Sequence, residues 1–300
     1  MIGLTGATGY IGSALTEEIL KRKIQSRFFS RKKNNLVSNN FFILDSFNCN
    51  AQLLSLLKGV NCLIHCAGIA GNISSNLKKK NHYEKINVEF TYNLAKAAIK
   101  SGVKRFIFIS SAKVNGESTD IDKPFKITDT ALPQTPYSKS KLDAENKLIE
   151  LSKKNNLEFV IIRSPAVYGK EHTGNIKKLS SIIKKKIPIP LGGIQNKRSF
   201  ISIENLVDFV ILCTTSKNAA NQIFFISDDQ DISTTELIKL IARDFNECPK
   251  FINLPNILIK FMRYFPGFSN IISQLFDSFR LDISYTKEKT GWRPIKKVNK

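Results

Sequence analysis

The sequence lacks several features that would assign the chain to particular classes of protein. None of its 300 residues lies in an uninterrupted apolar run of about 18, the length that a membrane-spanning helix needs. The first residues carry neither the basic region nor the apolar stretch of a secretory signal, so we expect a cytoplasmic protein. The five cysteines form no CxxC pair and are expected to be free thiols, and the three dispersed histidines predict no metal site.

Acidic residues are also scarce: 25 Asp and Glu stand against 46 Lys and Arg, which gives a net charge of +21. A charge of this size is typical of nucleic-acid-binding proteins when the cations are concentrated on one face or arm. Here they are scattered in short runs, such as residues 78–80, 184–186 and 296–297, so we do not expect nucleic acid as a partner. A basic surface would instead attract an anionic substrate or an anionic membrane face.

Residues 1–169 alternate short apolar runs with amphipathic stretches of helical length. Such an alternation of strand and helix predicts an α/β fold with a doubly wound parallel sheet, and we assign residues 1–169 to this first domain. We expect strands over residues 2–5, 27–30, 41–45, 62–66, 105–110 and 159–163, and helices over residues 10–23, 51–58, 83–101 and 138–155.

The pattern changes after about residue 170, where segments shorten and proline and glycine interrupt them. We interpret residues 170–300 as a smaller C-terminal α/β lobe that binds substrate over the carboxyl edge of the sheet, with some elements interleaving with the first domain. Helices are expected over residues 203–213 and 234–245. The tail 251–279 mixes Ile, Leu and Phe with Lys and Arg. It is typical of a helical part of the lobe, with peripheral membrane contact as the alternative.

Three glycines at intervals of three residues lie between the first expected strand and the first expected helix. They are Gly6, Gly9 and Gly12 in the segment TGATGYIG. In this setting the first glycine permits a tight turn, the second lets the backbone approach a pyrophosphate, and the third lets the helix pack close to the strand. The free amides and the positive dipole end of the helix then attract phosphate. The segment therefore predicts a dinucleotide-binding turn.

The end of the second expected strand carries no acidic residue. In folds of this kind that prefer NAD, an acidic side chain there usually binds the ribose 2′-hydroxyl. This chain has Ser30 and Arg31 instead, and a guanidinium suits a 2′-phosphate, which favours NADP over NAD. The alternative is that residues 31–33 form only a solvated turn. Asp45, just past the third expected strand, is a candidate acceptor for the adenine amine.

Tyr137 and Lys141 lie four residues apart at the start of an expected helix, so their side chains share one face. An ordinary tyrosine has a pKa of about 10 and is a weak base at neutral pH. A neighbouring ammonium and the positive field of a nicotinamide favour the phenolate, which lets Tyr137 exchange a proton with a substrate oxygen. Ser111, at the carboxyl end of a central strand, is a candidate to hydrogen-bond the same oxygen, whereas Ser110 fits a strand-terminating turn.

These motifs occur in order through nearly the whole chain, and together they resemble the extended short-chain dehydrogenase/reductases. Within that group the chain resembles the nucleotide-sugar epimerase/dehydratase family, whose Rossmann domain binds NAD or NADP. The segments that carry the resemblance are residues 5–12 (TGATGYIG), 65–68 (HCAG), 87–88 (NV), 110–112 (SSA), 137–141 (YSKSK), 163–169 (RSPAVYG), 198–202 (RSFIS) and 290–294 (TGWRP).

The resemblance implies roles for the residues at matching positions, and it implies a homodimer, because family members often pair through a four-helix arrangement. Ser111, Tyr137 and Lys141 would form the catalytic triad, and Lys141 would also hold the nicotinamide ribose. The substrate, a nucleotide sugar, would contact Lys113, Asn175, Arg198 and Arg280. Together with the positions discussed above, the residues expected to contact the cofactor are Gly6, Gly9, Tyr10, Ile11, Gly12, Ser30, Arg31, Asp45, Ala67, Gly68, Asn87, Ser110, Tyr137, Lys141, Pro165 and Val167.

Departures from the family pattern reduce the number of reactions that we expect this chain to catalyse. In 4,6-dehydratases the two residues after the catalytic hydroxyl are Asp and Glu, which move protons during water loss. Here they are Ala112 and Lys113, so we do not expect a dehydratase. The 4-epimerases keep NAD tightly bound and normally show the acidic residue that is missing at Ser30. A family tyrosine is also replaced by Asn115.

The remaining pattern resembles bacterial 4-ketoreductases that act on UDP-4-keto-6-deoxy-N-acetylhexosamines in surface-polysaccharide synthesis. One alternative is a UDP-hexose 4-epimerase, which would co-purify with NAD and consume no net cofactor. A second is a non-catalytic NADP-binding scaffold or sensor, although such proteins typically lose the pair that Tyr137 and Lys141 form here. A hydroxysteroid or flavonoid reductase shares the same core, but Arg198 favours a substrate that carries a diphosphate.

Overall fold

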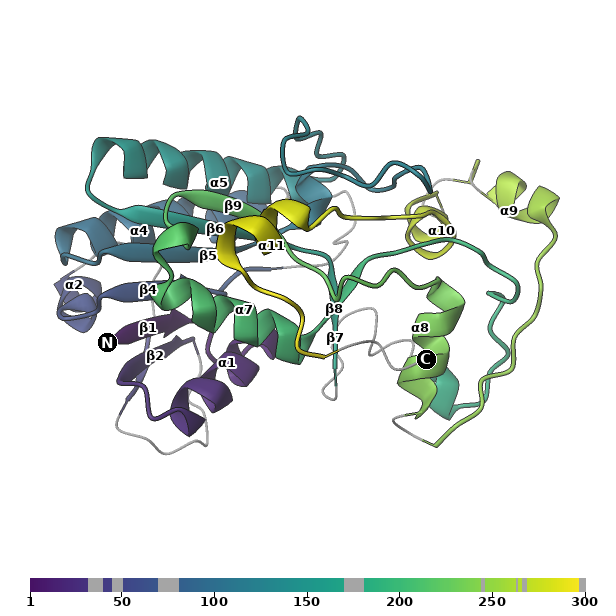
Figure 1. Ribbon diagram of the computed structural model, residues 1–300, viewed down its shortest axis with the longest axis horizontal. Coiled ribbons are helices and arrows are strands. Elements are labelled where there is room, and N and C mark those ends of the chain that lie inside the picture. The colour runs from purple at the N-terminus through teal and green to yellow at the C-terminus, as the bar shows by residue number, and fades with distance from the viewer. Residues whose placement is uncertain are drawn as a thin grey trace.

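The computed structural model describes residues 1–31, 40–44, 51–69, 81–169, 181–243, 246–262, 264–265 and 269–296. Its centre is a seven-stranded sheet (Figure 1). The strands of this sheet are β1 (Ile2–Thr5), β2 (Ser26–Ser30), β3 (Phe41–Ile43), β4 (Cys62–His65), β5 (Arg105–Ser111), β6 (Glu158–Ser164) and β9 (Gln222–Phe225).

The strands lie in the order β3-β2-β1-β4-β5-β6-β9, and every neighbouring pair is parallel. The chain winds outward in one direction from β1 and in the other direction from β4. The sheet is therefore doubly wound, as expected, and its topological switch point lies between β1 and β4, where ligands of such folds bind. β1, β4 and β5 are buried along their whole length, which explains why their sequences are mostly apolar.

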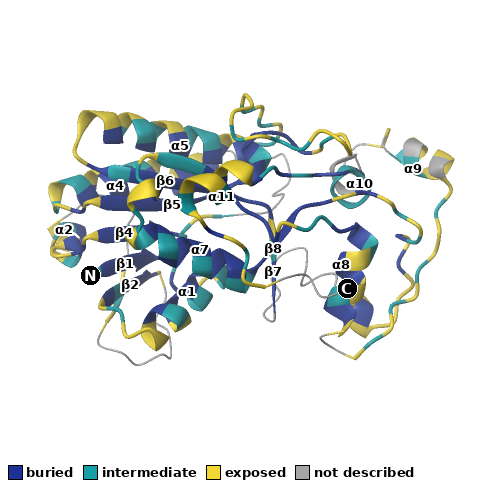
Figure 2. Cartoon of the chain, viewed as in Figure 1, coloured by how far each residue is buried: buried dark blue, intermediate teal, exposed yellow. Residues whose placement is uncertain are grey.

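Helices cover both faces of the sheet. α1 (Tyr10–Lys21) and α7 (Ile203–Thr215) pack on one face, and the apolar residues beneath them form one core cluster. α2 (Ala51–Leu57), α4 (Phe90–Lys100) and α5 (Pro136–Lys154) pack on the other face over a second cluster. Figure 2 shows the buried residues along the strands and on the helix sides that face them.

The chain after residue 170 contributes to two places. Besides β9 and α7, it supplies α11 (Ser284–Thr290), which packs beside β9. β8 (Phe200–Ser202) pairs with β7 (Ala166–Tyr168) in a separate two-stranded sheet. Beyond it lie α8 (Thr234–Arg243), α9 (Asn256–Met262) and α10 (Ser269–Phe276). A third apolar cluster includes residues of β8 and α8, and residues of α10 pack against it. The division into a Rossmann domain and a substrate lobe at residue 169 stays a prediction.

The helix expected over residues 83–101 differs from a regular α-helix, because Glu84–Glu89 form a π-helical segment before α4. Such widened turns are frequent at functional sites. Asn87 lies in this segment, and its side chain bonds to groups outside the helix. The third strand ends at Ile43, and Asp45 lies outside the described residues. No described helix is both long and apolar enough to cross a membrane.

Candidate active site

The glycine turn has the geometry that a pyrophosphate requires. Gly6 has a φ of +74°, and a Cβ atom there would lie 2.6 Å from the backbone nitrogen of Ala67. A Cβ on Gly12 would lie 2.0 Å from the carbonyl oxygen of Gly6, so only glycine lets α1 pack this close to the turn. Gly9 is the N-cap of α1 and has no side chain to bond the first-turn amides. Those amides fit the phosphates of a dinucleotide.

The end of β2 lies directly beside this turn. The carbonyl oxygen of Phe29 accepts hydrogen bonds from the backbone nitrogens of Gly6 and Ala7, at 3.0 and 3.3 Å. Ser30 and Arg31 follow immediately, the first buried and the second exposed. Their position is therefore the one from which a side chain reaches the adenosine ribose of a dinucleotide held by the turn.

α5 brings the predicted catalytic residues together at the end of β5. The helix begins sharply, with Thr135 as its N-cap in a reciprocal capping box with Ser138 and with Pro136 in its first turn. One turn later the Nζ of Lys141 donates to the carbonyl oxygen of Ile109 at 2.9 Å. It also lies 4.6 Å from the centre of the Phe108 ring.

Tyr137 and Ser111 are hydrogen-bonded to each other through their side chains. Burial of the hydroxyl raises the pKa of Tyr137 to about 12; the bond to Ser111 opposes that rise, and Tyr83 and Glu117 add to it. Burial also lowers the pKa of Lys141 to about 8, with Cys66 and Glu145 acting in the opposite direction. In the protein alone, Tyr137 is therefore a neutral phenol at neutral pH, which suits a proton donor.

Asn87 joins the loop after β4 to α5. Its amide nitrogen donates to the Oγ of Ser140 at 3.0 Å and to the carbonyl oxygen of Ile69 at 3.1 Å. Its oxygen accepts from the backbone nitrogen of Ile69 at 2.9 Å. The loop that holds Ala67 and Gly68 is thereby fixed against the helix that carries Tyr137 and Lys141. Asn87 thus holds together the loop after β4 and helix α5, between which we expect the cofactor to lie.

The sequence did not lead us to predict a buried ion pair, Glu145–Arg163, that lies beneath the catalytic residues. Glu145 is fully buried on α5, and Arg163 on β6 binds its carboxylate, with the shortest contact at 2.6 Å. Ser110 donates to the same carboxylate, and Asn115 accepts from Arg163 at 2.9 Å. The spacing of Glu145, four residues after Lys141, places it on the catalytic face and is the signal that could have found it.

The other expected cofactor contacts lie around the same edge. Tyr10 and Ile11 are in the first turn of α1 and are half-buried. A Cβ on Gly169 would lie 3.0 Å from the Tyr10 hydroxyl, so α1 meets the segment that follows β7. Pro165 is buried after β6, and Val167 is half-buried in β7. These residues lie around the carboxyl edge of the sheet, and their contact with the cofactor stays a prediction.

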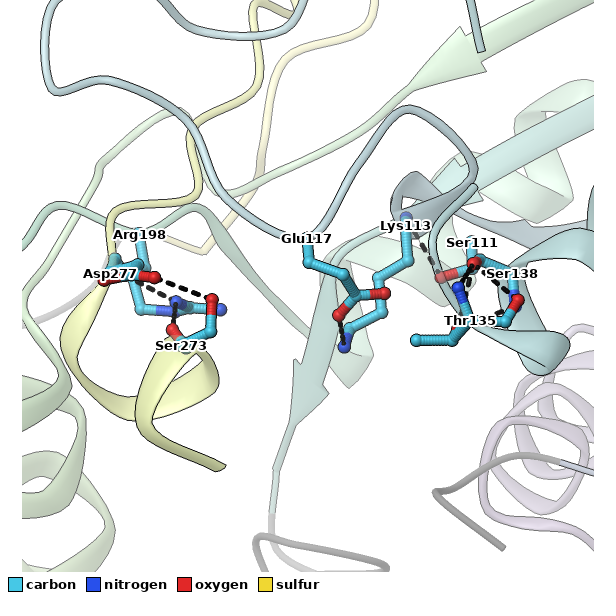
Figure 3. Close-up of polar contacts among 8 residues, drawn as sticks. All are labelled: Ser111, Lys113, Glu117, Thr135, Ser138, Arg198, Ser273 and Asp277. Atoms are coloured by element: carbon cyan, nitrogen blue, oxygen red, sulfur yellow. Dashed lines mark hydrogen bonds and ion pairs between the residues drawn. The ribbon is translucent and has the colours of Figure 1, made fainter. Parts of the chain in front are cut away.

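The expected substrate contacts lie farther out, and Figure 3 draws two of them. Lys113 pairs with Glu117 at 2.5 Å, and the guanidinium of Arg198 donates to the carbonyl oxygen of Asp277 at 2.6 Å. Burial lowers the pKa of Arg198 to about 10. Arg280 bonds to Asp231 at 2.6 Å, so a carboxylate already neutralises it. Asn175 lies outside the described residues.

Comparison with known proteins gives concordant matches. Residues 2–227 match the NAD dependent epimerase/dehydratase family. The chain is 38% identical over 294 residues to a UDP-glucose 4-epimerase of Vibrio cholerae, which covers 97% of this chain and 90% of that protein. It is 28% identical to a dTDP-4-dehydro-6-deoxyglucose reductase of Escherichia coli, over 97% of this chain and 92% of that one.

A solved structure supports the fold. A UDP-glucuronic acid 4-epimerase from Bacillus cereus, in complex with UDP-glucuronic acid and NAD, matches with a TM-score of 0.79 at 20% identity. The match covers 99% of this chain and 95% of that one. The family match over residues 2–227 and the 38% identity over nearly the whole chain confirm the resemblance drawn from the motifs. The chain is an enzyme of the NAD-dependent epimerase/dehydratase family, within the extended short-chain dehydrogenase/reductases.

Proposed function

We propose that the enzyme reduces the 4-keto group of a UDP-4-keto-6-deoxy-N-acetylhexosamine with NADPH, in the synthesis of surface polysaccharide. The observation that carries this proposal is the position of Ser30 and Arg31 beside the glycine turn, where a carboxylate would favour NAD. Ala112 and Lys113 support it, because the segment after Ser111 lacks the carboxylates that a dehydratase needs.

The catalytic residues suit reduction of a carbonyl group. Ser111 and Tyr137, which bond to each other in the protein alone, would both donate to the C4 carbonyl oxygen. A reduced nicotinamide would supply the hydride that C4 receives. Tyr137 would give its proton to the oxygen, and its raised pKa keeps that proton in place until charge develops on the substrate. Lys141 would hold the cofactor ribose and stabilise the phenolate that forms.

A second candidate is a UDP-hexose 4-epimerase, favoured by the 38% identity to the relative of that name. Such an enzyme would use the same Tyr137 and Lys141 but would keep its cofactor bound and regenerate it in each cycle. The two activities therefore differ in cofactor consumption.

The test is nicotinamide oxidation by the purified enzyme with UDP-4-keto-6-deoxy-N-acetylglucosamine and either NADPH or NADH. We expect rapid oxidation of NADPH and slower oxidation of NADH. Arg31→Ala should raise the KM for NADPH about tenfold and leave that for NADH unchanged, because one charge-assisted contact to the 2′-phosphate is lost. Arg22→Ala, which removes an exposed arginine at the far end of α1, is the control. No oxidation, with NAD released on denaturation, would favour the epimerase.

We also propose that the enzyme contacts a membrane surface through α9 and the residues after it. Five large apolar side chains are exposed there, and the net charge of +21 favours an anionic surface. Co-sedimentation with phosphatidylglycerol vesicles, and its absence with phosphatidylcholine, tests the contact. The exposed side chains are Ile257, Leu258, Phe261, Tyr264 and Phe265.

The cytoplasmic location and the homodimer stay predictions. Light scattering measures the oligomeric state.

A further inference from the structure

The loop after β5 carries an acidic residue to which no role has been assigned. Beyond Ser111 the chain makes a 3₁₀ turn, Ala112–Val114, and continues through Asn115 and Gly116 to Glu117. Gly116 has a φ of +153°, and a Cβ atom there would lie 2.7 Å from the ring of Phe125. Only glycine allows the loop to pass Phe125 at this distance, and the tight passage brings Glu117 back into the protein.

The two carboxylate oxygens of Glu117 have different surroundings. Oε2 accepts from the Nζ of Lys113 at 2.5 Å. Oε1 is buried and has no hydrogen-bond partner among the described residues, although the residue as a whole is only 8% exposed. A buried carboxylate oxygen without a donor is costly, and nearly all buried polar atoms in native proteins have a partner. The free oxygen therefore indicates a donor that comes from a ligand.

Glu117 lies between the two parts of the candidate site. Figure 3 draws the Lys113–Glu117 pair with Ser111 on one side and Arg198 on the other. The negative charge of Glu117 raises the pKa of Tyr137, and it opposes the lowering of the Arg198 pKa by burial. Its carboxylate is therefore near enough to both residues to act on them electrostatically. An open depression lined by residues 118–126 and 276–278 adjoins the same loop and the carbonyl partner of Arg198.

We propose that Glu117 is a specificity-determining residue, whose Oε1 accepts a hydrogen bond from a hydroxyl or amide N–H group of the substrate sugar. This inference rests on the proposed function, in which a sugar nucleotide reaches from the catalytic pair to Arg198. Lys113 orients the carboxylate and balances its charge, so the pair does not repel the diphosphate. The donor lies on the sugar rather than on the nucleotide, because Glu117 is on the catalytic side of Arg198.

The test compares a sugar nucleotide with the nucleotide alone. Binding of UDP-N-acetylglucosamine and of UDP is measured by titration calorimetry for the wild type, Glu117→Gln and Glu117→Ala. We expect the Gln variant to bind the sugar nucleotide about tenfold more weakly and the Ala variant about 100-fold more weakly. Affinity for UDP should not fall in either variant. Glu150→Gln is the control, because Glu150 forms an exposed pair with Lys154 at the same sequence spacing.

The outcomes separate this role from the proposed function. If the variants bind UDP-N-acetylglucosamine as tightly as the wild type, the role of Glu117 is wrong and the proposed function stands. If the variants lose affinity for UDP and for UDP-N-acetylglucosamine by the same factor, Glu117 acts on the whole site and not on the sugar. That result also overturns the inference. If the wild type binds neither nucleotide, the proposed function fails and the role of Glu117 fails with it. Thermal unfolding with NADPH present shows that each variant is folded.

Discussion

The two cations at the ends of the candidate site are held by similar groups but positioned by different parts of the chain. Lys141 donates to a strand carbonyl, that of Ile109, and lies over the ring of Phe108. Arg198 donates to the carbonyl oxygen of Asp277, just after α10, and lies over the ring of Phe279. Neutral carbonyl acceptors leave both positive charges available to an anionic or electron-rich ligand. Lys141 takes its place one helical turn from Tyr137, whereas Arg198 depends on a partner 79 residues downstream.

Because of this difference, substitutions at the catalytic end, near Lys141, and at the substrate end, near Arg198, should affect different properties of the enzyme. The catalytic end is fixed by the regular geometry of α5 and by buried polar contacts to β5 and β6. The substrate end depends on how the lobe packs. Substitutions at the catalytic end should therefore change chemistry and stability, and those at the substrate end should change affinity.

The largest effect is expected from Tyr137→Phe at the catalytic end. The variant loses the proton that the substrate oxygen receives, and kcat should fall by roughly 10²- to 10⁴-fold. The affinity for NADPH, followed by fluorescence titration, should stay at the wild-type value. Tyr264→Phe makes the same change at a position that is 85% exposed, and it should leave kcat unchanged. Retained turnover in the Tyr137 variant would exclude it as the proton donor.

The next largest effect concerns the ion pair beneath the catalytic residues. Glu145→Ala leaves the buried Arg163 without its carboxylate, and we expect the free energy of unfolding to fall by about 3–5 kcal/mol. Urea unfolding followed by circular dichroism measures the change. Glu150→Ala, on the same helix but in an exposed pair, should have no measurable effect. Equal effects of the two substitutions would show that burial does not determine how much the Glu145–Arg163 pair contributes to the free energy of unfolding.

Local patterns predicted much of this site. The glycine turn and the Tyr137–Lys141 pair follow from spacings within one turn or one helix, and the parallel sheet follows from strand–helix alternation. The partners of Arg163, Arg198 and Glu117 depend on which elements meet in three dimensions, and periodicity holds no such information. β9 was also missed, although residues 223–226 form a short apolar run of β-branched and aromatic residues before a polar turn, which is the signal of a buried strand.

At the substrate end, Arg198 and Arg280 should differ in their effect on binding. The guanidinium of Arg198 donates to the carbonyl oxygens of Ser273 and Asp277, whereas Arg280 forms an ion pair with the carboxylate of Asp231. We expect Arg198→Met to weaken UDP binding by roughly 10- to 100-fold, as loss of a charge-assisted contact does. Arg280→Met should weaken it less. Titration calorimetry with UDP measures both, and a larger loss at Arg280 would reverse the assignment of the diphosphate contact.

The smallest effect is the pH dependence that His65 adds to stability. His65 is buried at the end of β4, with one ring nitrogen 2.6 Å from the Oγ1 of Thr5 and the other 2.9 Å from that of Thr91. Burial, with a smaller contribution from Lys141, lowers its pKa to about 3. The unfolded chain binds a proton here below about pH 6.5, while the folded chain does not, so protonation favours unfolding.

The contribution of His65 is therefore complete above about pH 6.5 and is lost as the pH falls toward 3. Between pH 6 and 4.5, the unfolding free energy of the wild type should fall more steeply than that of His65→Gln, by up to about 1.4 kcal/mol per pH unit. All other titrating groups are common to the two proteins, so the difference between the slopes isolates this residue. Parallel slopes would mean that His65 takes up its proton in the folded state, and that the catalytic end is more open to water than the contacts of Thr5 and Thr91 indicate.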